Sequence, residues 1–572
     1  MERTPRRTAL FALLMVLALV AAACGGGNDD DGGGNAGGEG TTETTEAEEE
    51  AVKGGTAVFG AEQEPDCADW IATCAGASWG TYTMAAHTMP RPYNFDPKTS
   101  ELVPSELLAE EPKLEEGPPQ KVSYKINPDA VWSDGTPITS ADFKYTWEQI
   151  VNGKDIYDKT GYDQITAVDD SKPKEVVVTF KTQYAPWKTL FGGFYGIYPK
   201  HIVGTGDEAA RNAAMKDGYK WSGGPWMIES WTKGQEVKLI PNPKWYGEKK
   251  ANLDAVVFKF LADSAAEQQA YKTGQVSMIY PQAQLELADL KTLPDTKFDV
   301  TSSLSYEALW INTTKEPVNS KAVRQAMAYA MDRDAAVKTL FGPVQPDIKP
   351  IHAFVSSANK QWYSDPFKKY TRDLKKVDEL MTGDGWKKGA DGIWEKGGKK
   401  AEIENSTTAG NKRRELTQEI LTSQFKEAGF IFKVNNTTPA TLFGEWGPKG
   451  VYTTAIYAQV PSSTDPGVCE VFCTKSIPTT DKPSGTNWTR LSDPAIDKAL
   501  EAADLELDEG KRKKLIDEGH AAVAEGVPGI PIDPFPDIVI YNTSKLRGPI
   551  DHNVVYGPWF NMNEWYCDGG TC

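Results

Sequence analysis

The chain has 572 residues, of which 40% are hydrophobic and 25% are charged, and its formal net charge is -18 at pH 7. A chain of this length can bury a large core and is too long for one simple domain. The acidic balance leaves no basic patch, which excludes nucleic acid as a partner.

The N-terminus has the pattern of an export signal. A basic start precedes an apolar run, residues 11–20, which is too short for a membrane span of about 20 residues. Alanines 21–23 and then Cys24 follow. This order resembles a bacterial lipobox, in which the cysteine is lipidated and becomes the new N-terminus, although Ala21 stands where leucine is usual. The alternative is an ordinary secreted protein that is cleaved within residues 21–23.

The segment after the signal is acidic and rich in glycine. Residues 24–53 contain too few apolar side chains to offset the chain entropy of folding, which predicts a disordered tether. We therefore expect a signal peptide over residues 1–23 and an exported protein, held at the outer face of the cell membrane by a lipid on Cys24.

The other cysteines fall in close pairs, and an even number in an exported chain indicates disulfides. Six cysteines allow 15 pairings, and local pairing is the simplest. The predicted disulfides are Cys67–Cys74, Cys469–Cys473 and Cys567–Cys572. No cluster of cysteine and histidine has zinc spacing, so neither a metal nor a cofactor is predicted.

Strands and helices alternate along the chain, which favours a mixed α/β class. Alternating β-branched residues predict strands at residues 55–60, from Lys121, from Glu175, from Asp254 and from Glu307, with a hairpin over residues 226–243 that turns at Lys233-Gly234. Helices are predicted at residues 139–151, opened by a Thr139/Asp142 capping box, at 320–331, at 411–428 before Gly429, and from Asp493-Pro494.

Several segments resemble, in the same order, the family 5 extracellular solute-binding proteins. They are GGTAVFGAEQEPDCADW, AVWSDGTPITSADFKYTWEQI, the hairpin segment beginning SGGPWMIESW, INTTKEPVNSKAVRQAMAYAMDRDAAVKTLFG and LSDPAIDKALEAAD. Each also has a local structural reading: in WSDGTPIT, Asp134-Gly135 forms a turn and Thr139 caps the next helix.

The resemblance implies a two-lobed, periplasmic-binding-protein-like (type II) fold with an extra subdomain on the first lobe. The first lobe would comprise residues 54–305, with the subdomain at about 91–215, and the second lobe residues 306–526; residues 527–572 would return to the first lobe. It further implies a monomer without enzymatic activity. This monomer would capture a short peptide or a similar polar solute and deliver it to a membrane permease and its ATPase subunits.

The resemblance also indicates a ligand loop in YAQVPSSTDPG, residues 457–467. Peptide binders of the family can hold the ligand's α-ammonium on an aspartate, and Ser462 stands at that place here. Asp465 matches a later family position, although a turn residue before proline explains it equally well. The remaining candidate ligand residues, for whose tryptophans core packing is the alternative, are Glu62, Gln63, Trp79, Trp446, Tyr457, Gln459, Asn487 and Trp488.

Other functions have weaker support in the sequence. Residues 76–80 match the G-x-S-x-G pattern of serine hydrolases, but a nucleophile elbow requires a strand before the serine and a helix after it, and the context predicts a loop. No phosphate-binding G-x-x-x-x-G-K-[ST] loop is present. An oligosaccharide or another solute is an alternative ligand, and a purely structural surface protein would not need the two-lobe layout.

Overall fold

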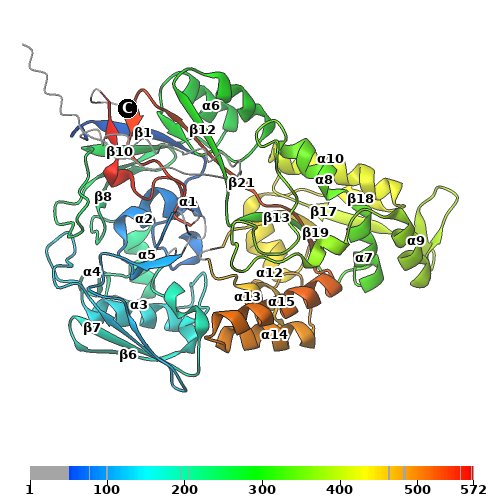
Figure 1. Cartoon of the computed structure of the whole chain (residues 1–572), viewed down its shortest axis with the longest axis horizontal. Coiled ribbons are helices and arrows are strands. Elements are labelled where there is room, and N and C mark those ends of the chain that lie inside the picture. Colours follow the sequence, from blue (N-terminus) through cyan, green and yellow to red (C-terminus); the bar gives the residue numbers. More distant parts are fainter. Residues whose placement is uncertain are drawn as a thin grey trace, which may run out of the picture. The chain divides into compact units, whose positions relative to one another are not determined.

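The computed structural model describes residues 51–572 except residues 76, 77, 98, 100, 194, 205, 462, 463, 481–484, 554, 569 and 571. The predicted signal peptide, Cys24 and the tether up to residue 50 lie outside the described residues, and so does Ser462. Ala51–Cys572 forms one compact unit, drawn as a ribbon in Figure 1.

The first sheet takes its strands from both halves of the chain. Its order is β12 (Thr296–Ser302), β21 (Pro536–Asn542), β11 (Met278–Ile279), β1 (Thr56–Ala61), β10 (Ala255–Phe260), β9 (Glu236–Pro241) and β8 (Trp226–Thr232). β1 runs parallel to β10 and β11, whereas the other neighbours are antiparallel. The predicted hairpin is β8–β9, and Gly234 at its turn has a φ of 74°, which glycine adopts without strain.

A smaller antiparallel sheet and one helix follow β1 in the chain. The sheet has the order β4 (Lys113–Glu115), β5 (Lys121–Lys125), β7 (Glu175–Phe180) and β6 (Ile165–Lys172), and α3 (Ser140–Asn152) packs on it. The predicted capping box is present, because the Thr139 backbone N–H donates to Asp142 over 2.8 Å. WSDGTPIT lies between β5 and α3, with Gly135 at a φ of 90°.

The second sheet lies between residues 306 and 533 of the chain. Its order is β18 (Ile431–Val434), β17 (Glu402–Ser406), β19 (Thr454–Gln459), β13 (Tyr306–Ile311) and β20 (Gly529–Asp533). The long helices of this region are α7 (Lys321–Ala330), α8 (Arg333–Phe341), α9 (Leu374–Gly383), α10 (Lys412–Glu427), α14 (Pro494–Leu505) and α15 (Glu509–Gly526). The Asn411 side chain caps α10, and Asp493 caps α14.

Short elements complete both regions. The short helices are α1 (Ser78–Gly80), α2 (Ala86–Thr88), α4 (Lys200–Val203), α5 (Glu208–Met215), α6 (Ser264–Lys272), α11 (Pro439–Thr441), α12 (Gly447–Lys449) and α13 (Val468–Phe472). The short strands are β2 (Tyr93–Phe95), β3 (Leu102–Pro104), β14 (Lys387–Lys388), β15 (Trp394–Lys396), β16 (Lys399–Lys400), β22 (Leu546–Arg547) and β23 (Tyr566–Cys567).

The chain passes from the first sheet to the second through residues 303–305, between β12 and β13, and returns through residues 534–535, between β20 and β21. Because β20 still pairs with β13, the return falls after Asp533 rather than at residue 527. β12 and β21 pair side by side on the first-sheet side of these connections (Figure 1). The structure therefore confirms the predicted two-lobed α/β fold.

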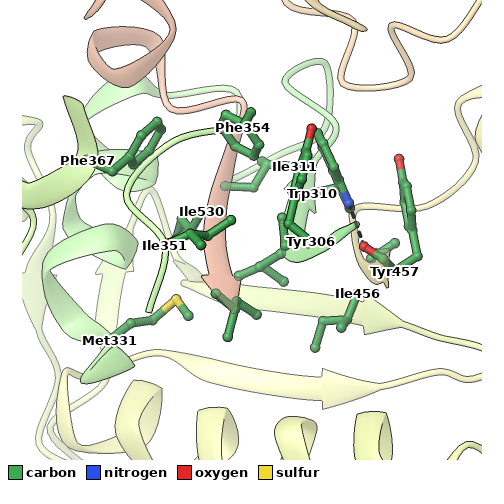
Figure 2. Packing of buried hydrophobic residues seen from close by; sticks show 14 of the residues in the cluster. Tyr306, Trp310, Ile311, Met331, Ile351, Phe354, Phe367, Ile456, Tyr457 and Ile530 are labelled. Atoms are coloured by element: carbon green, nitrogen blue, oxygen red, sulfur yellow. Dashed lines mark hydrogen bonds between the residues drawn. The ribbon is translucent and has the colours of Figure 1, made fainter. Parts of the chain in front are cut away.

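The lobe around the second sheet has a core rich in aromatic side chains. Trp310 on β13 stacks on Tyr457 of β19, with ring centroids 5.2 Å apart, and on Phe354, with centroids 5.1 Å apart. Figure 2 shows these rings together with the hydrogen bond that the Trp310 indole donates to the Tyr457 carbonyl over 2.9 Å. Stacked aromatic pairs of this kind add about 0.5–1.5 kcal/mol beyond the burial of their surface.

The predicted disulfides are present in the structure. Cys67–Cys74, Cys469–Cys473 and Cys567–Cys572 are bonded, with Cα atoms 5.7, 4.7 and 5.4 Å apart. In the part of the chain that the structure describes, no helix has both the length and the apolar character needed to cross a bilayer.

Candidate interlobe binding site

The ends of strands from both sheets lie near the connections between the lobes. In the first lobe, β1 ends before Glu62 and β11 ends before Tyr280; in the second lobe, β19 runs directly into the predicted ligand loop. Ligands of open α/β sheets bind outside the carboxyl ends of the strands, so this edge is the natural place for a binding site.

The ligand loop is fixed to the second lobe by two contacts. The Asn359 side-chain amide donates to the Thr464 carbonyl over 2.7 Å, and Asp465 forms an ion pair with Arg512 over 2.6 Å. The Arg512 guanidinium also lies 5.0 Å from the centroid of the Trp362 ring. The side chains of Asp465 and Arg512 are only 14% and 8% exposed, so the charge of Asp465 is balanced within its own lobe.

Asp465 therefore lies in the predicted place but already has a partner. It also accepts a hydrogen bond from the Gly467 backbone N–H over 3.3 Å, which fits the alternative reading as a turn residue. Beside it, a small cavity is lined by Leu304 of the first connection, Tyr306, Phe354, Val355, Asn359, Pro461, Asp465 and Pro466.

Asn487 and Trp488 differ in whether their side chains are free to contact a ligand. Asn487 is completely buried, and its side-chain amide donates to the carbonyls of Phe472, Cys473 and Leu491, so it has a structural task. Trp488 is half-buried, and its indole N–H donates to the Gly485 carbonyl over 3.0 Å.

Aromatic rings form one wall of the site. Tyr457 lies with its ring 5.8 Å from that of Trp488 and 5.7 Å from that of Phe443, which is 36% exposed. Trp446 is half-buried against the same core. Gln459 at the end of β19 is half-buried and pairs in register with Tyr306. The structure thus brings the predicted second-lobe aromatic residues together.

The first-lobe candidates have different surroundings. Trp79 is 6% exposed, and its ring lies 5.9 Å from Tyr280 and 6.0 Å from Trp559, which agrees with its alternative reading as a core residue. Gln63 is exposed. Glu62 is 6% exposed and accepts a hydrogen bond from the Gln282 backbone N–H over 2.9 Å.

A group of acidic residues between the lobes was not predicted from the sequence. Glu470 on α13 faces Asp158 of the first lobe, and burial followed by the charge of Asp158 raises the pKa of Glu470 to about 8. Burial, then the charge of Asp465, raises the pKa of Asp504 to about 7. Near them, Tyr157 is 50% exposed, and burial with the charges of Glu470 and Asp158 raises its pKa to about 12. No spacing motif marks these acids, because different lobes contribute them.

The chemistry of this arrangement suits binding. Aromatic faces, carboxyl groups and an amide can hold a polar solute that carries a positive charge. Among the described residues, histidine, cysteine, aspartate and glutamate do not gather in groups that could hold a metal ion.

The G-x-S-x-G pattern lacks the surroundings of a nucleophile elbow. Gly76 and Ala77 lie outside the described residues. Ser78 begins the short helix α1 after a 3-10 turn, Thr73–Ala75, and not after a strand. His87 is 1% exposed, and its Nε2 lies 2.8 Å from the Tyr82 carbonyl oxygen.

Comparisons with known proteins agree with this description. Residues 103–471 match the model of the bacterial extracellular solute-binding proteins, family 5. The oligopeptide-binding protein OppA of Mycobacterium tuberculosis is 25% identical over 472 residues, which cover 80% of this chain and 76% of that protein. The oligopeptide-binding protein AppA of Bacillus subtilis is 26% identical over 496 residues, covering 83% and 85% of the two chains.

Solved structures share the fold. The structure of AppA from Bacillus subtilis in complex with a nonapeptide superposes with a TM-score of 0.77 at 22% identity, covering 91% of this chain and 100% of that chain. The periplasmic EDTA-binding protein EppA superposes with a TM-score of 0.80 at 24% identity, covering 90% and 97%. From the sequence match, which spans more than half of its length, this chain belongs to family 5 of the bacterial extracellular solute-binding proteins.

Proposed function

We propose that this chain is the substrate-binding component of an ABC importer. It captures a short peptide or a similar polar solute between its lobes and delivers it to a membrane permease and its ATPase subunits. The observation that carries the proposal is that strand ends of both sheets, the ligand loop and the aromatic side chains lie at one region between the lobes. Similarity to proteins named oligopeptide-binding over four-fifths of the chain supports it.

The second lobe supplies the side chains for capture. The half-buried Trp446 and Trp488 pack against apolar parts of the ligand. Tyr457 supports Trp488 from the core at only 7% exposure, and Gln459 offers hydrogen bonds at the end of β19. Ligand contacts with both lobes stabilise the closed form only through their preference for it.

Glu470 takes the part of the aspartate that Ser462 replaces. Asp465 is balanced by Arg512, whereas the charges that act most strongly on Glu470 are those of other acids, with Asp158 first among them. A ligand ammonium between these two carboxyl groups relieves their repulsion and gains charge-assisted hydrogen bonds.

The N-terminal segment indicates the cellular location of the protein. Cleavage before Cys24 and lipidation of that residue anchor a monomer to the outer face of the cell membrane, where the lobes can reach the permease. Two acyl chains give stable anchoring, whereas one gives only marginal binding.

Calorimetry tests the assignment with two probes, tetra-alanine and N-acetyl-tetra-alanine, after native mass spectrometry has shown whether a ligand co-purifies. Tetra-alanine is expected to bind, and Glu470→Gln is expected to weaken that binding by tenfold or more, the equivalent of about 1.4 kcal/mol. The same variant leaves binding of the acetylated peptide unchanged. Glu501→Gln is the matched control, because Glu501 is an exposed acid of the same lobe, 47% exposed and facing Lys475.

A solute of another class is the second candidate, since the EDTA-binding protein EppA has the same fold. Binding of an oligosaccharide such as maltotetraose, with none of either peptide, would replace the peptide assignment.

A further inference from the structure

Six buried charged residues lie where the two lobes meet beside the connections, and we call them the hinge charge cluster. They are Glu62 and Glu267 of the first lobe and Glu307, Arg413, Arg414 and Asp533 of the second lobe. None of them is more than 9% exposed. Four carboxyl groups thus share a buried space with two guanidinium groups.

In the second-lobe half of the cluster, one carboxylate forms ion pairs with both arginines. Glu307 pairs with Arg413 over 2.7 Å and with Arg414 over 2.6 Å. The Arg413 guanidinium also lies 4.7 Å above the ring of Phe535 in the return connection. The carboxyl group of Asp533, 1% exposed, lies close enough to act on both arginines. Glu307 therefore offsets part of the charge of these two arginines, while no nitrogen of Arg413 has a hydrogen-bond partner among the described residues.

Among the described residues, the cation that acts on the first-lobe half is Arg413 of the second lobe, and it acts on Glu62. Glu267 on α6 is completely buried, and neither of its carboxyl oxygens has a hydrogen-bond partner. It lies against β1, since a Cβ on Gly60 would stand 3.4 Å from its Oε1. Glu62 follows β1 and is held by the Gln282 backbone. Two buried carboxylates without a paired cation cost several kcal/mol each, so at least one must keep a proton.

A hydrogen bond crosses between the lobes at this place. The Asn411 side chain, which caps α10, donates to the Gln282 side-chain oxygen over 3.3 Å, and Gln282 in turn binds Glu62 through its backbone. The groups that face Glu62 are Glu267 from α6, Arg413 from α10 and the hydroxyl of Tyr280 after β11. Groups of both lobes therefore surround Glu62.

We propose that Glu62 takes up a proton when the lobes close and releases it when they open, so that closure of the protein weakens as the pH rises from acidic toward neutral. The proposal rests on the proposed function, since it assumes that the lobes open and close around a solute. It makes the hinge charge cluster a proton-linked latch rather than a fixed structural element.

The direction of the effect follows from the titration of Glu62 in the two forms. In the structure, burial raises the pKa of Glu62 to about 7, and the charge of Arg413 offsets this only in part. Burial and the charge of Glu62 hold the pKa of Glu267 well above its ordinary value. With water admitted, Glu62 returns toward its ordinary pKa of about 4.3. A raised pKa in the closed form means that low pH favours closure.

The size of the pH effect corresponds to one proton bound for each molecule that closes. Between about pH 4 and pH 7 an open molecule must bind a proton in order to close, and the ratio of closed to open molecules falls about tenfold per pH unit. Above about pH 7 both forms have lost this proton and the ratio no longer changes. A pH series from 5 to 9 therefore shows a fall that levels off near neutral pH.

Small-angle X-ray scattering of the ligand-free chain measures the closed fraction across this series. The wild type is expected to expand between pH 5 and pH 7 and then to stay constant. Glu62→Gln removes the group and is expected to give a profile without that step. Glu248→Gln removes an exposed acid from the same lobe and is expected to retain it. A flat wild-type profile, or a step that survives in Glu62→Gln, overturns the proposal.

Infrared spectroscopy keeps the test decisive if Glu62→Gln fails to fold. The spectra are then taken on Glu470→Gln/Asp504→Asn, which removes two other acids whose pKa values are raised to about 8 and about 7. This variant is expected to show a buried carboxylic-acid carbonyl band at pH 6 that weakens by pH 8, and a band that does not change with pH overturns the proposal. The tetra-alanine titration at pH 6 separates the two ideas. Peptide binding with a flat scattering profile rejects only the proton-linked latch. A pH-dependent profile in a protein that binds neither tetra-alanine nor maltotetraose rejects only the proposed function.

Discussion

Asp465 offers the sharpest test of how the ligand loop is built, because the sequence and the structure give it different tasks. The family pattern places it among the ligand residues, whereas the structure pairs it with Arg512 over 2.6 Å. The substitution Asp465→Asn keeps the size of the side chain and removes its charge. We expect it to reduce stability strongly and to change ligand affinity little.

The size of the loss follows from the burial of the pair. Breaking a fully buried ion pair by removing one partner costs about 3–5 kcal/mol, because a charge stays behind unpaired. Here the two side chains are 14% and 8% exposed, and Arg512 keeps a hydrogen bond of 3.0 Å to the Ala503 carbonyl and its contact with Trp362. We therefore expect a loss of about 2–3 kcal/mol in the free energy of unfolding, somewhat below that range.

Urea unfolding followed by tryptophan fluorescence measures this loss, and calorimetry on the same preparation measures affinity. The control is Glu501→Gln, which breaks a pair with Lys475 whose side chains are 47% and 54% exposed, and it should cost about 0–1 kcal/mol. The reasoning would be refuted if Asp465→Asn left the unfolding midpoint unchanged and lowered ligand affinity by tenfold or more. Asp465 would then be a ligand residue and Arg512 only its neighbour.

The remaining predictions concern anchoring, the disulfide near the ligand loop, the aromatic wall and acid stability. Cys24→Ser moves the protein from the membrane fraction to the soluble fraction, as cell fractionation would show; an unchanged membrane fraction would exclude lipidation at this residue. Replacing Cys469 and Cys473 by alanine costs about 2 kcal/mol in the chain-entropy model for so short a loop, measured by urea unfolding. Trp488→Ala weakens binding of the acetylated peptide by about tenfold, measured by calorimetry, because one ring of the wall is lost. The paired arginines hold the pKa of Glu307 below its ordinary value despite its burial. The stabilisation by Glu307 is therefore present above its pKa in the unfolded chain and is lost as the pH falls through its pKa in the folded protein. Acid unfolding of Glu307→Gln should lack this pH-dependent loss of stability.

The sequence predicts most of the fold because its local signals agree with one another. The Thr139/Asp142 box, the turn at Gly234 and the Asn411 cap each lie where the predicted elements begin or turn. Close spacing of the cysteines was enough to predict the disulfides. The end of the second lobe was harder, because β20 belongs to that lobe only through its pairing with β13, which is far away in the sequence.

The binding site was predicted less completely, for a different physical reason. The aromatic residues Tyr457 and Trp488 belong to segments that the family pattern marks, and the structure brings them together. Whether a polar residue is free for a ligand depends on its partners, which a sequence does not show. Asn487 was predicted as a ligand residue, but its amide is used by three carbonyls within the lobe. Asp158 and Glu470 were missed because their proximity arises only when the lobes meet.

Several features that the sequence analysis treated separately serve one purpose in the structure. α13, which carries Glu470, comprises only the five residues Val468–Phe472, and a helix of this length is not stable on its own. The Cys469–Cys473 bond closes this turn, and Asn487 binds the carbonyls at its end. The ion pair of Asp465 fixes the chain just before it. Changes at Cys469, Cys473 and Asn487 should therefore alter solute binding through the placement of Glu470, and their effect on affinity should be lost for a ligand whose ammonium group has been acetylated.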